Sequence, residues 1–127
     1  RALGLEDRVH FPGYLDGENY VGMLKAFDVK VLLVPGSDGT CRAVREAMAM
    51  ARPAIVADRG MLKEIVDDGV NGHVFDGSAQ GLFNAIDPLV PNRQRLRQMG
   101  QAAREKALRE FSLESQARMV HSAYGEL

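Results

Sequence analysis

The fold is decided by residues 29–50, which read VKVLLVPGSDGTCRAVREAMAM. The apolar run at residues 29–34 predicts a buried strand, residues 35–40 are typical of a tight loop, and residues 41–50 predict a helix. At such a junction, backbone N–H groups and the positive end of the helix dipole converge on an anion. Two carboxylates, Asp38 and Glu46, flank that spot eight residues apart. The stretch therefore predicts a binding site for a ligand that carries both phosphate and hydroxyl groups.

The alternation of strand and helix continues on both sides of this stretch. Further strands are expected at residues 9–11, 53–57 and 73–75, and helices at residues 18–27 and 61–66. From Ser78 onward the pattern is helical, with a break at residues 111–112 and Ser112 as the N-cap of a final helix. That helix carries apolar residues at helical spacing, namely Leu113, Ala117, Val120, Tyr124 and Leu127. Short strands alternating with helices predict an α/β fold with a parallel sheet, flanking helices and an all-helical tail.

The composition is that of an ordinary globular protein. Of the 127 residues, 46% are apolar and 26% are charged, and no apolar run approaches the length of a membrane span. A single cysteine, Cys41, excludes an internal disulfide and any zinc site built from several cysteines. The chain begins at Arg1, so we interpret it as a segment of a longer protein. No signal-peptide pattern is present, and we expect a cytoplasmic location.

Charge is unevenly distributed along the chain. Residues 1–90 hold 9 basic and 13 acidic side chains, whereas residues 91–118 hold 7 basic and 3 acidic ones. One interpretation of the basic stretch is a solvated helix face with intrahelical ion pairs. Another is a surface that docks on a partner domain or on the anionic inner face of a membrane. Nucleic acid is not expected as a partner, because Tyr and Phe are not interleaved with these basic residues.

Other phosphate chemistries can be tested against the same stretch. The haloacid-dehalogenase phosphatases need a nucleophilic aspartate two residues before Asp38, where this chain has Gly36. The loop of the cysteine phosphatases needs an arginine six residues after Cys41, where this chain has Ala47. No P-loop, no dinucleotide fingerprint and no metal-ligand spacing of histidines occurs. An ion pair between Arg42 and Glu46 remains as a purely structural alternative to ligand binding.

Four segments in the right order carry a resemblance to a known family. They are LEDRVHFPG at residues 5–13, AFDVKVLLVP at residues 26–35, the acid-x7-acid unit DGTCRAVRE followed by AMA at residues 38–49, and RPAIVADRGMLKEIVDDGVNG at residues 52–72. Together they resemble the C-terminal, donor-binding part of the GT-B retaining glycosyltransferases of family four. The resemblance spans nearly the whole chain. It implies that residues 1–110 form part of a Rossmann-like nucleotide-sugar-binding domain, the C-terminal half of the GT-B C-terminal domain, and that residues 111–127 form a closing helix.

The resemblance implies an enzyme that moves a sugar from a nucleotide-diphosphate-sugar donor to a glycan, lipid or small-molecule acceptor, with retention of the anomeric configuration. It implies no cofactor and no essential metal. The first acid, Asp38, would bind the sugar hydroxyls as the catalytic residue, and the second, Glu46, would hold the ribose. The remaining donor-binding residues that it implies, around the diphosphate, the sugar and the base, are Gly39, Thr40, Cys41, Arg42, Gly13 and Tyr14.

The sequence also departs from the family pattern. Asp38 stands where Glu is usual, and Thr40 and Cys41 stand where Phe-Gly or Phe-Pro is common. The family's Gly-Arg…Lys-Gly phosphate-binding segment and its N-terminal acceptor domain do not occur in this stretch. In the family the sheet order is 3-2-1-4-5-6, with residues 9–11 resembling strand 3 and residues 29–34 resembling strand 4. The two strands that lie between these in the family's sheet do not occur in this stretch. We therefore expect that the 127-residue chain alone transfers no sugar, and that it either self-associates or is mobile in the residues before about Asp28. Two alternatives stay open, a nucleotide-sugar-binding module without transfer and another phosphate-handling α/β enzyme.

Overall fold

A computed structural model describes residues 3–35 and 41–125 of the chain. Its three strands form one parallel sheet in the order β1-β2-β3, with β1 at Lys30–Leu32, β2 at Ala54–Ala57 and β3 at Gly72–Phe75. In the register, Lys30 lies opposite Ala54, and Ile55 lies opposite His73. The predicted α/β class and the parallel sheet are therefore confirmed.

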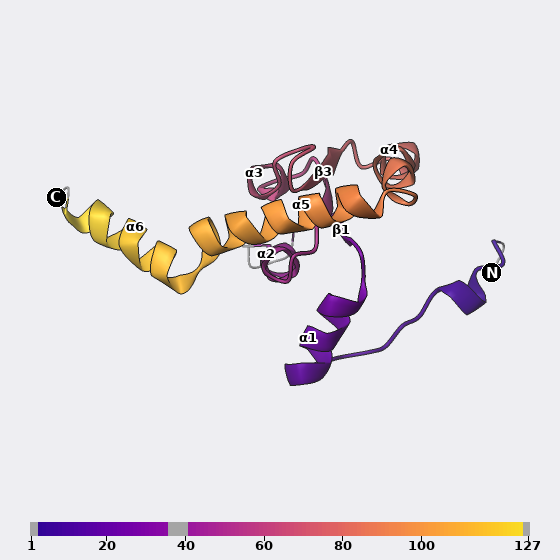
Figure 1. Cartoon of the computed structure of the whole chain (residues 1–127), viewed down its shortest axis with the longest axis horizontal. Helices are drawn as coiled ribbons and strands as arrows, with labels where there is room; N and C mark the ends of the chain where they lie inside the picture. Colours follow the sequence, from indigo (N-terminus) through magenta and orange to yellow (C-terminus); the bar gives the residue numbers. More distant parts are fainter. Residues whose placement is uncertain (1–2, 36–40, 126–127) are drawn as a thin grey trace.

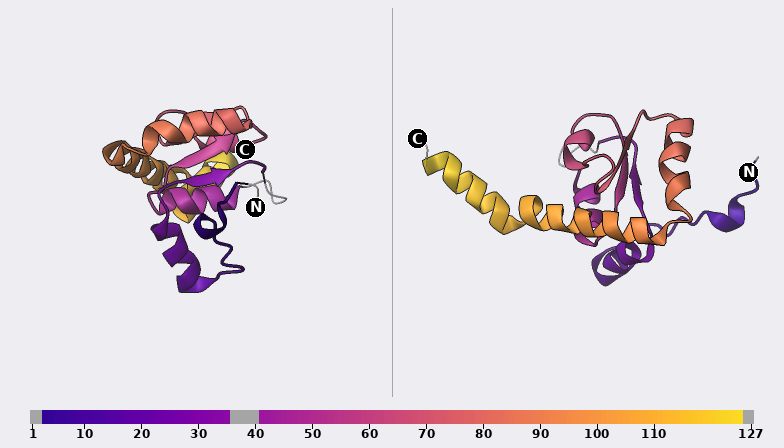
Figure 2. Two further views of the ribbon diagram at one scale, coloured as in Figure 1. Left: turned by 90° about the vertical axis from the view of Figure 1, so that its right-hand side faces the viewer. Right: turned by 45° about the horizontal axis from the view of Figure 1, so that its top comes forward.

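Helices link and cover these strands (Figures 1 and 2). In chain order they are η1 (Glu6–Arg8), α1 (Gly17–Ala26), α2 (Arg42–Ala49), α3 (Leu62–Ile65), α4 (Ala79–Ile86), η2 (Asp87–Leu89), α5 (Arg93–Lys106), the π-helical turn η3 (Ala107–Phe111) and α6 (Leu113–Gly125). Within the described range, every element after β3 is helical, as predicted. None of the described helices is long and apolar enough to span a membrane.

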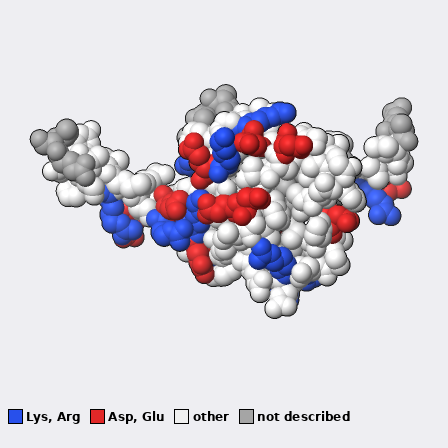
Figure 3. Space-filling model, turned by 90° about the horizontal axis from the view of Figure 1, so that it is seen from above, with Lys and Arg blue, Asp and Glu red and all other residues white. Residues whose placement is uncertain are grey.

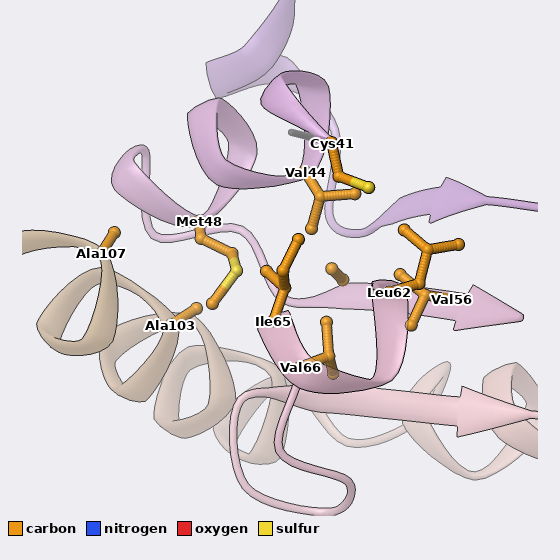
Figure 4. Packing of buried hydrophobic residues seen from close by; sticks show 10 residues of the cluster. Cys41, Val44, Met48, Val56, Leu62, Ile65, Val66, Ala103 and Ala107 are labelled. Carbon is orange, nitrogen blue, oxygen red and sulfur yellow. The ribbon is translucent and has the colours of Figure 1, made fainter. Parts of the chain in front are cut away.

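Two apolar clusters hold the central strand between layers of helices. All four residues of β2 are fully buried, which is typical of a strand covered on both faces. On one face Val56 packs with Val44 and Met48 of α2 and with Leu62 of α3 (Figure 4). On the other face, the cluster comprises residues from β2, β3, η2 and α5, namely Ile55, Ala57, Phe75, Leu89 and Met99, with Leu82, Ala85 and Ile86 of α4 packed against it. Burial of this apolar surface is the main force that assembles the three layers.

Helix α5 contributes to both clusters because it runs past the edge of both layers (Figure 2). Met99 packs in one cluster, whereas Ala103 packs in the other, together with Ala107 of η3. At Gly100 a Cβ atom would lie 2.2 Å from the carbonyl oxygen of Ala51. The glycine therefore lets α5 approach the segment between α2 and β2 without a side chain in between.

The strand expected at residues 9–11 does not form, and this prediction is wrong. The segment has no strand geometry, and Phe11 is 91% exposed. A strand needs a hydrogen-bonded neighbour. In the described part of the chain, both neighbours of β2 are already supplied by β1 and β3, and no strand lies next to residues 9–11.

The final helix projects from the body of the molecule (Figure 2). Ser112 caps it as predicted, since its Oγ accepts a hydrogen bond from the backbone N–H of Ser115 at 3.1 Å. Of the apolar positions predicted on this helix, Leu127 lies outside the described residues and the other four are exposed, with Leu113 at 86% and Tyr124 at 72%. Among the described residues, the helix contacts the preceding turn η3, where Ser115 Oγ donates a hydrogen bond to the carbonyl of Arg109 at 2.5 Å.

Candidate functional site

A cavity of about 430 Å³ lies beside the first turns of α2. Its walls come from the segment before α1, from α1 itself and from α2, and they are formed by Tyr14, Leu15, Asp16, Tyr20, Arg42, Ala43 and Glu46. Three of the predicted donor-binding residues, Tyr14, Arg42 and Glu46, are thereby brought together, although Tyr14 lies 28 positions before Arg42. The cavity thus places these three residues together, and their roles in binding a donor stay predictions.

The side chain of Glu46 on α2 is held by a residue of another helix. The hydroxyl of Tyr20 on α1 donates a hydrogen bond to Glu46 Oε2. Among the described side chains, Glu46 is bonded to Tyr20 and not paired with Arg42, so the structural alternative of an Arg42–Glu46 ion pair is not observed. The hydrogen bond to Glu46, together with burial and the negative charge of Glu46, raises the pKa of Tyr20 to about 12. The phenol is therefore protonated, and can donate, throughout the physiological pH range.

Tyr20 was not predicted as a site residue. It lies one helical turn before Leu24, the buried residue of α1, so helical spacing could have placed it on the inward face. No local pattern could have identified its partner, because Glu46 is 26 residues away and belongs to another helix.

Cys41 forms the turn into α2. It is the N-cap residue of the helix, one position before the first turn in which it was expected, and its φ of 53° lies in the left-handed region. Its carbonyl accepts hydrogen bonds from Val44 N at 3.1 Å and Arg45 N at 3.3 Å. Its side chain is 2% exposed and packs with Val44 in the core. The side chain of Cys41 therefore does not line the cavity.

The other predicted residues differ in what the structure says of them. Gly13 adopts a φ of 75°, a left-handed conformation that glycine tolerates, and it precedes Tyr14, which is 92% exposed at the cavity. Asp38, Gly39 and Thr40 lie outside the described residues. The prediction that Asp38 and Glu46 converge on one cleft therefore stays a prediction.

The two arginines of α2 face different surroundings. Arg42, the first residue of the helix, lines the cavity. The guanidinium of Arg45 stacks on the ring of Phe111, with Cζ 4.8 Å from the ring centroid. Because the positive end of the helix dipole disfavours a cation, Arg42 is the arginine that an anion in the cavity would stabilise.

The basic stretch at residues 91–118 forms ion pairs. Arg118 pairs with Glu114 at 2.7 Å within α6, and Arg93 pairs with Asp28 at 2.6 Å. Figure 3 shows basic and acidic side chains next to one another on the face it presents. The Arg118–Glu114 pair is of the intrahelical kind expected for a solvated helix face, whereas the Arg93–Asp28 pair joins α5 to the residue two positions before β1. Docking on a membrane or a partner domain stays a prediction. Among the described residues, no three His, Cys, Asp or Glu side chains gather in a way that could hold a metal ion.

Comparison with known proteins identifies the family. The model of the family described as "Glycosyl transferases group 1" matches residues 1–106. The chain belongs to this family. No curated protein matches its sequence significantly.

Solved structures of relatives share the fold over nearly the whole chain. The chain is 26% identical to sucrose-phosphate synthase from Thermosynechococcus elongatus, with a TM-score of 0.77 over 98% of its length. It is 26% identical to Anabaena Alr3699/HepE, solved in complex with UDP-glucose, with a TM-score of 0.83 over 99% of its length. The same Anabaena protein has also been solved with UDP and glucose. The chain covers 31% and 34% of the lengths of these two relatives. The resemblance seen in the sequence and the fold that it implied are thus confirmed.

Proposed function

We propose that this chain is the nucleotide-sugar-binding part of a retaining glycosyltransferase. The single observation that carries the proposal is the cavity beside α2, where the carboxylate of Glu46 is held by Tyr20 next to Arg42 and Tyr14. Family membership and the likeness to a protein solved with UDP-glucose support the same ligand class. The donor we propose is a nucleoside-diphosphate sugar such as UDP-glucose.

In this proposal each residue meets one part of the donor. Glu46 accepts hydrogen bonds from the ribose hydroxyls, and Tyr14 with the backbone at Gly13 borders the base. The first turn of α2, with Arg42 and the backbone of Cys41, binds the diphosphate. Asp38 binds the sugar hydroxyls, with the amides of Gly39 and Thr40 beside it.

Transfer then breaks the bond between the anomeric carbon and the diphosphate oxygen. A new bond forms from an acceptor hydroxyl oxygen to the same face of the anomeric carbon, so the configuration is retained, and the hydroxyl proton passes to the leaving diphosphate oxygen. The leaving diphosphate carries the bonding electrons, and the positive end of α2 and Arg42 stabilise that charge without a metal ion. The acceptor, a glycan, lipid or small molecule, would bind on an N-terminal acceptor domain such as the resemblance implies.

Calorimetric titration of UDP into the protein as its gene encodes it tests the proposal. We expect Glu46→Ala to weaken UDP binding by about 10- to 150-fold, because a hydrogen bond to a charged group contributes about 1.5 to 3 kcal/mol. Glu105→Ala, an exposed position on α5, serves as the matched control and should bind UDP as the parent does. Absence of UDP binding by the parent, or equal binding by the Glu46→Ala variant, would contradict the proposal.

An assay of UDP release from UDP-glucose separates transfer from binding alone. Release that depends on an acceptor supports the transferase. UDP-glucose binding with neither transfer nor hydrolysis would support the alternative of a binding module without transfer.

A further inference from the structure

The link between α1 and α2 is made at the ligand cavity itself. Leu24 is the buried residue of α1, and Tyr20 lies one turn before it on the same face. From there the phenol reaches Glu46 Oε2 on α2, and both side chains line the cavity. Figure 1 shows α1 lying below α2, away from the sheet. The hydrogen bond thus connects a lightly packed helix to the carboxylate assigned above to the ribose.

This hydrogen bond restricts what the carboxylate can do. A glutamate side chain has three rotatable bonds, and an ionised carboxylate offers about four acceptor positions on its two oxygens. The phenol occupies one of these positions on Oε2 and fixes the direction of the group. Among the described residues no other group is hydrogen-bonded to the Glu46 carboxylate, so Oε1 and the second position on Oε2 are left for a ligand. A vicinal diol presents two O–H donors to a carboxylate, and a fixed carboxylate accepts both with less loss of rotamer freedom than a mobile one.

We propose that Tyr20 is a positioning residue that holds the Glu46 carboxylate in the orientation that accepts both hydroxyls of the nucleotide's ribose. This inference rests on the proposed function and adds a specificity to it. The Tyr20 hydroxyl strengthens the binding of ligands that carry the vicinal diol and does not affect ligands that lack it. The high pKa of Tyr20 agrees with this role, because the hydroxyl keeps its proton at the pH at which an enzyme works.

Two other roles of the same hydrogen bond make different predictions. If Tyr20 only fastens α1 to the body, its loss would weaken the binding of all nucleotides equally, through the shape of the cavity. If the phenol instead competes with the ribose for the carboxylate, its loss would tighten binding. The three roles are therefore distinguished by whether the change in affinity on removing the Tyr20 hydroxyl differs between nucleotides with and without the diol.

The experiment compares UDP with 2′,3′-dideoxyuridine diphosphate by calorimetric titration, using the protein as its gene encodes it. The variants are Tyr20→Phe, which removes only the hydroxyl, and Tyr124→Phe, a control on α6 at an exposed tyrosine outside the cavity. We expect Tyr20→Phe to weaken UDP binding about three- to tenfold and to leave the dideoxy nucleotide unchanged. Tyr124→Phe should change neither affinity.

The same substitution made in the Glu46→Ala variant provides a second test. In the Glu46→Ala variant, where no carboxylate remains to be positioned, adding Tyr20→Phe should have no further effect on UDP affinity. Equal losses for both nucleotides, no loss, or tighter UDP binding by Tyr20→Phe would each overturn the inference while leaving the proposed function in place. Failure of the parent protein to bind UDP would instead overturn the proposed function, and the inference with it.

Discussion

The ammonium of Lys106, at the end of α5, lies 3.1 Å from Asp67 Oδ1, although the lysine side chain is only 6% exposed. The same ammonium donates to the carbonyl of Glu64 at 3.3 Å. The other carboxylate oxygen of Asp67 accepts from Asn71 Nδ2 at 3.0 Å, and Asn71 is 2% exposed. One carboxylate therefore serves two buried polar groups and fastens α5 to the segment that leads into β3.

We expect Asp67→Ala to lower the free energy of unfolding by roughly 2 to 4 kcal/mol, because the Asn71 amide and the Lys106 ammonium lose this carboxylate. Among the described carboxylates, the Lys106 ammonium then keeps only the more distant Glu110 Oε2, at 4.0 Å. Lys106→Met should cost less, about 1 kcal/mol, because it removes the buried charge and leaves Asp67, which is half exposed, to water. Urea unfolding of both variants at neutral pH measures the difference. A larger loss for Lys106→Met than for Asp67→Ala would show that the carboxylate does not have this double role.

Gly100 is predicted to be the glycine of the helices that tolerates substitution least. In Gly100→Ala the new Cβ would lie 2.2 Å from a backbone carbonyl oxygen, that of Ala51, which cannot rotate away as a side chain could. We expect a loss of about 1 to 3 kcal/mol despite the better helix propensity of alanine. Thermal unfolding monitored by circular dichroism measures this loss.

Gly22→Ala is the matched control for Gly100→Ala. Gly22 also lies within a helix, but its Cβ would meet nothing within 4 Å. Here the propensity of alanine acts alone, and we expect an unchanged or slightly higher Tm. If both variants melted alike, the close approach of α5 to Ala51 would not be a real constraint.

Most elements of the fold could be predicted because the sequence specifies them locally. The apolar run at residues 29–34 contains β1, and the prediction for residues 53–57 contains β2. The parallel order follows from helices that return the chain to the same end of the sheet. Residues 9–11 were predicted wrongly because their apolar pattern is typical of a strand, but a strand also depends on a neighbour that local sequence does not reveal.

The candidate site was predictable to a similar extent. Glu46 and Arg42 could be identified because they follow a strand and a loop at the start of a helix, where anions bind. The partnership of Tyr20 with Glu46 depends on how α1 lies against α2, which no spacing within either helix encodes. The exposure of apolar residues of α6, such as Leu113, could not be predicted either. Helical periodicity identifies an apolar face, but it does not reveal which element, if any, packs against that face.

The pH dependence of stability should include a contribution from Asp68. The backbone N–H of Val74 donates to Asp68 Oδ1 at 3.0 Å and His73 Nδ1 lies 3.1 Å from it, and these contacts hold the pKa of Asp68 below its usual range. A carboxyl whose pKa is lower in the folded state stabilises the fold above its unfolded pKa of about 3.9. That contribution is lost as the pH falls through the lower folded value.

Asp68→Asn imitates the protonated carboxyl and tests this contribution. At pH 7 the variant should be less stable than the parent, by under about 1 kcal/mol because the side chain is 63% exposed. The difference should shrink as the pH falls below about 4. Urea unfolding of both proteins between pH 7 and pH 3 measures it. A difference that stays constant over this range would show that the ionised form of Asp68 contributes nothing.

Replacing Asp38 and replacing Glu46 should impair different properties of the enzyme. Asp38 lies outside the described residues and eight positions before Glu46. In the proposed function its partner is the sugar, whose charge and geometry change during transfer, whereas the partner of Glu46 is the ribose, which does not react. An interaction with the reacting part of a substrate shows in kcat, and one with a remote part shows first in binding.

We therefore expect Asp38→Ala to lower kcat at least about tenfold while nucleoside diphosphate affinity stays within about twofold. Glu46→Ala should weaken that affinity more than tenfold. Steady-state transfer kinetics and nucleotide titration on the same preparations separate the two effects. Asp58→Ala provides the control, since Asp58 is an exposed carboxylate paired with Lys63 at 3.4 Å on the surface after β2. Equal losses of nucleotide affinity in the Asp38→Ala and Glu46→Ala variants would mean that both carboxylates bind the nucleotide, and that the sugar is held by other residues.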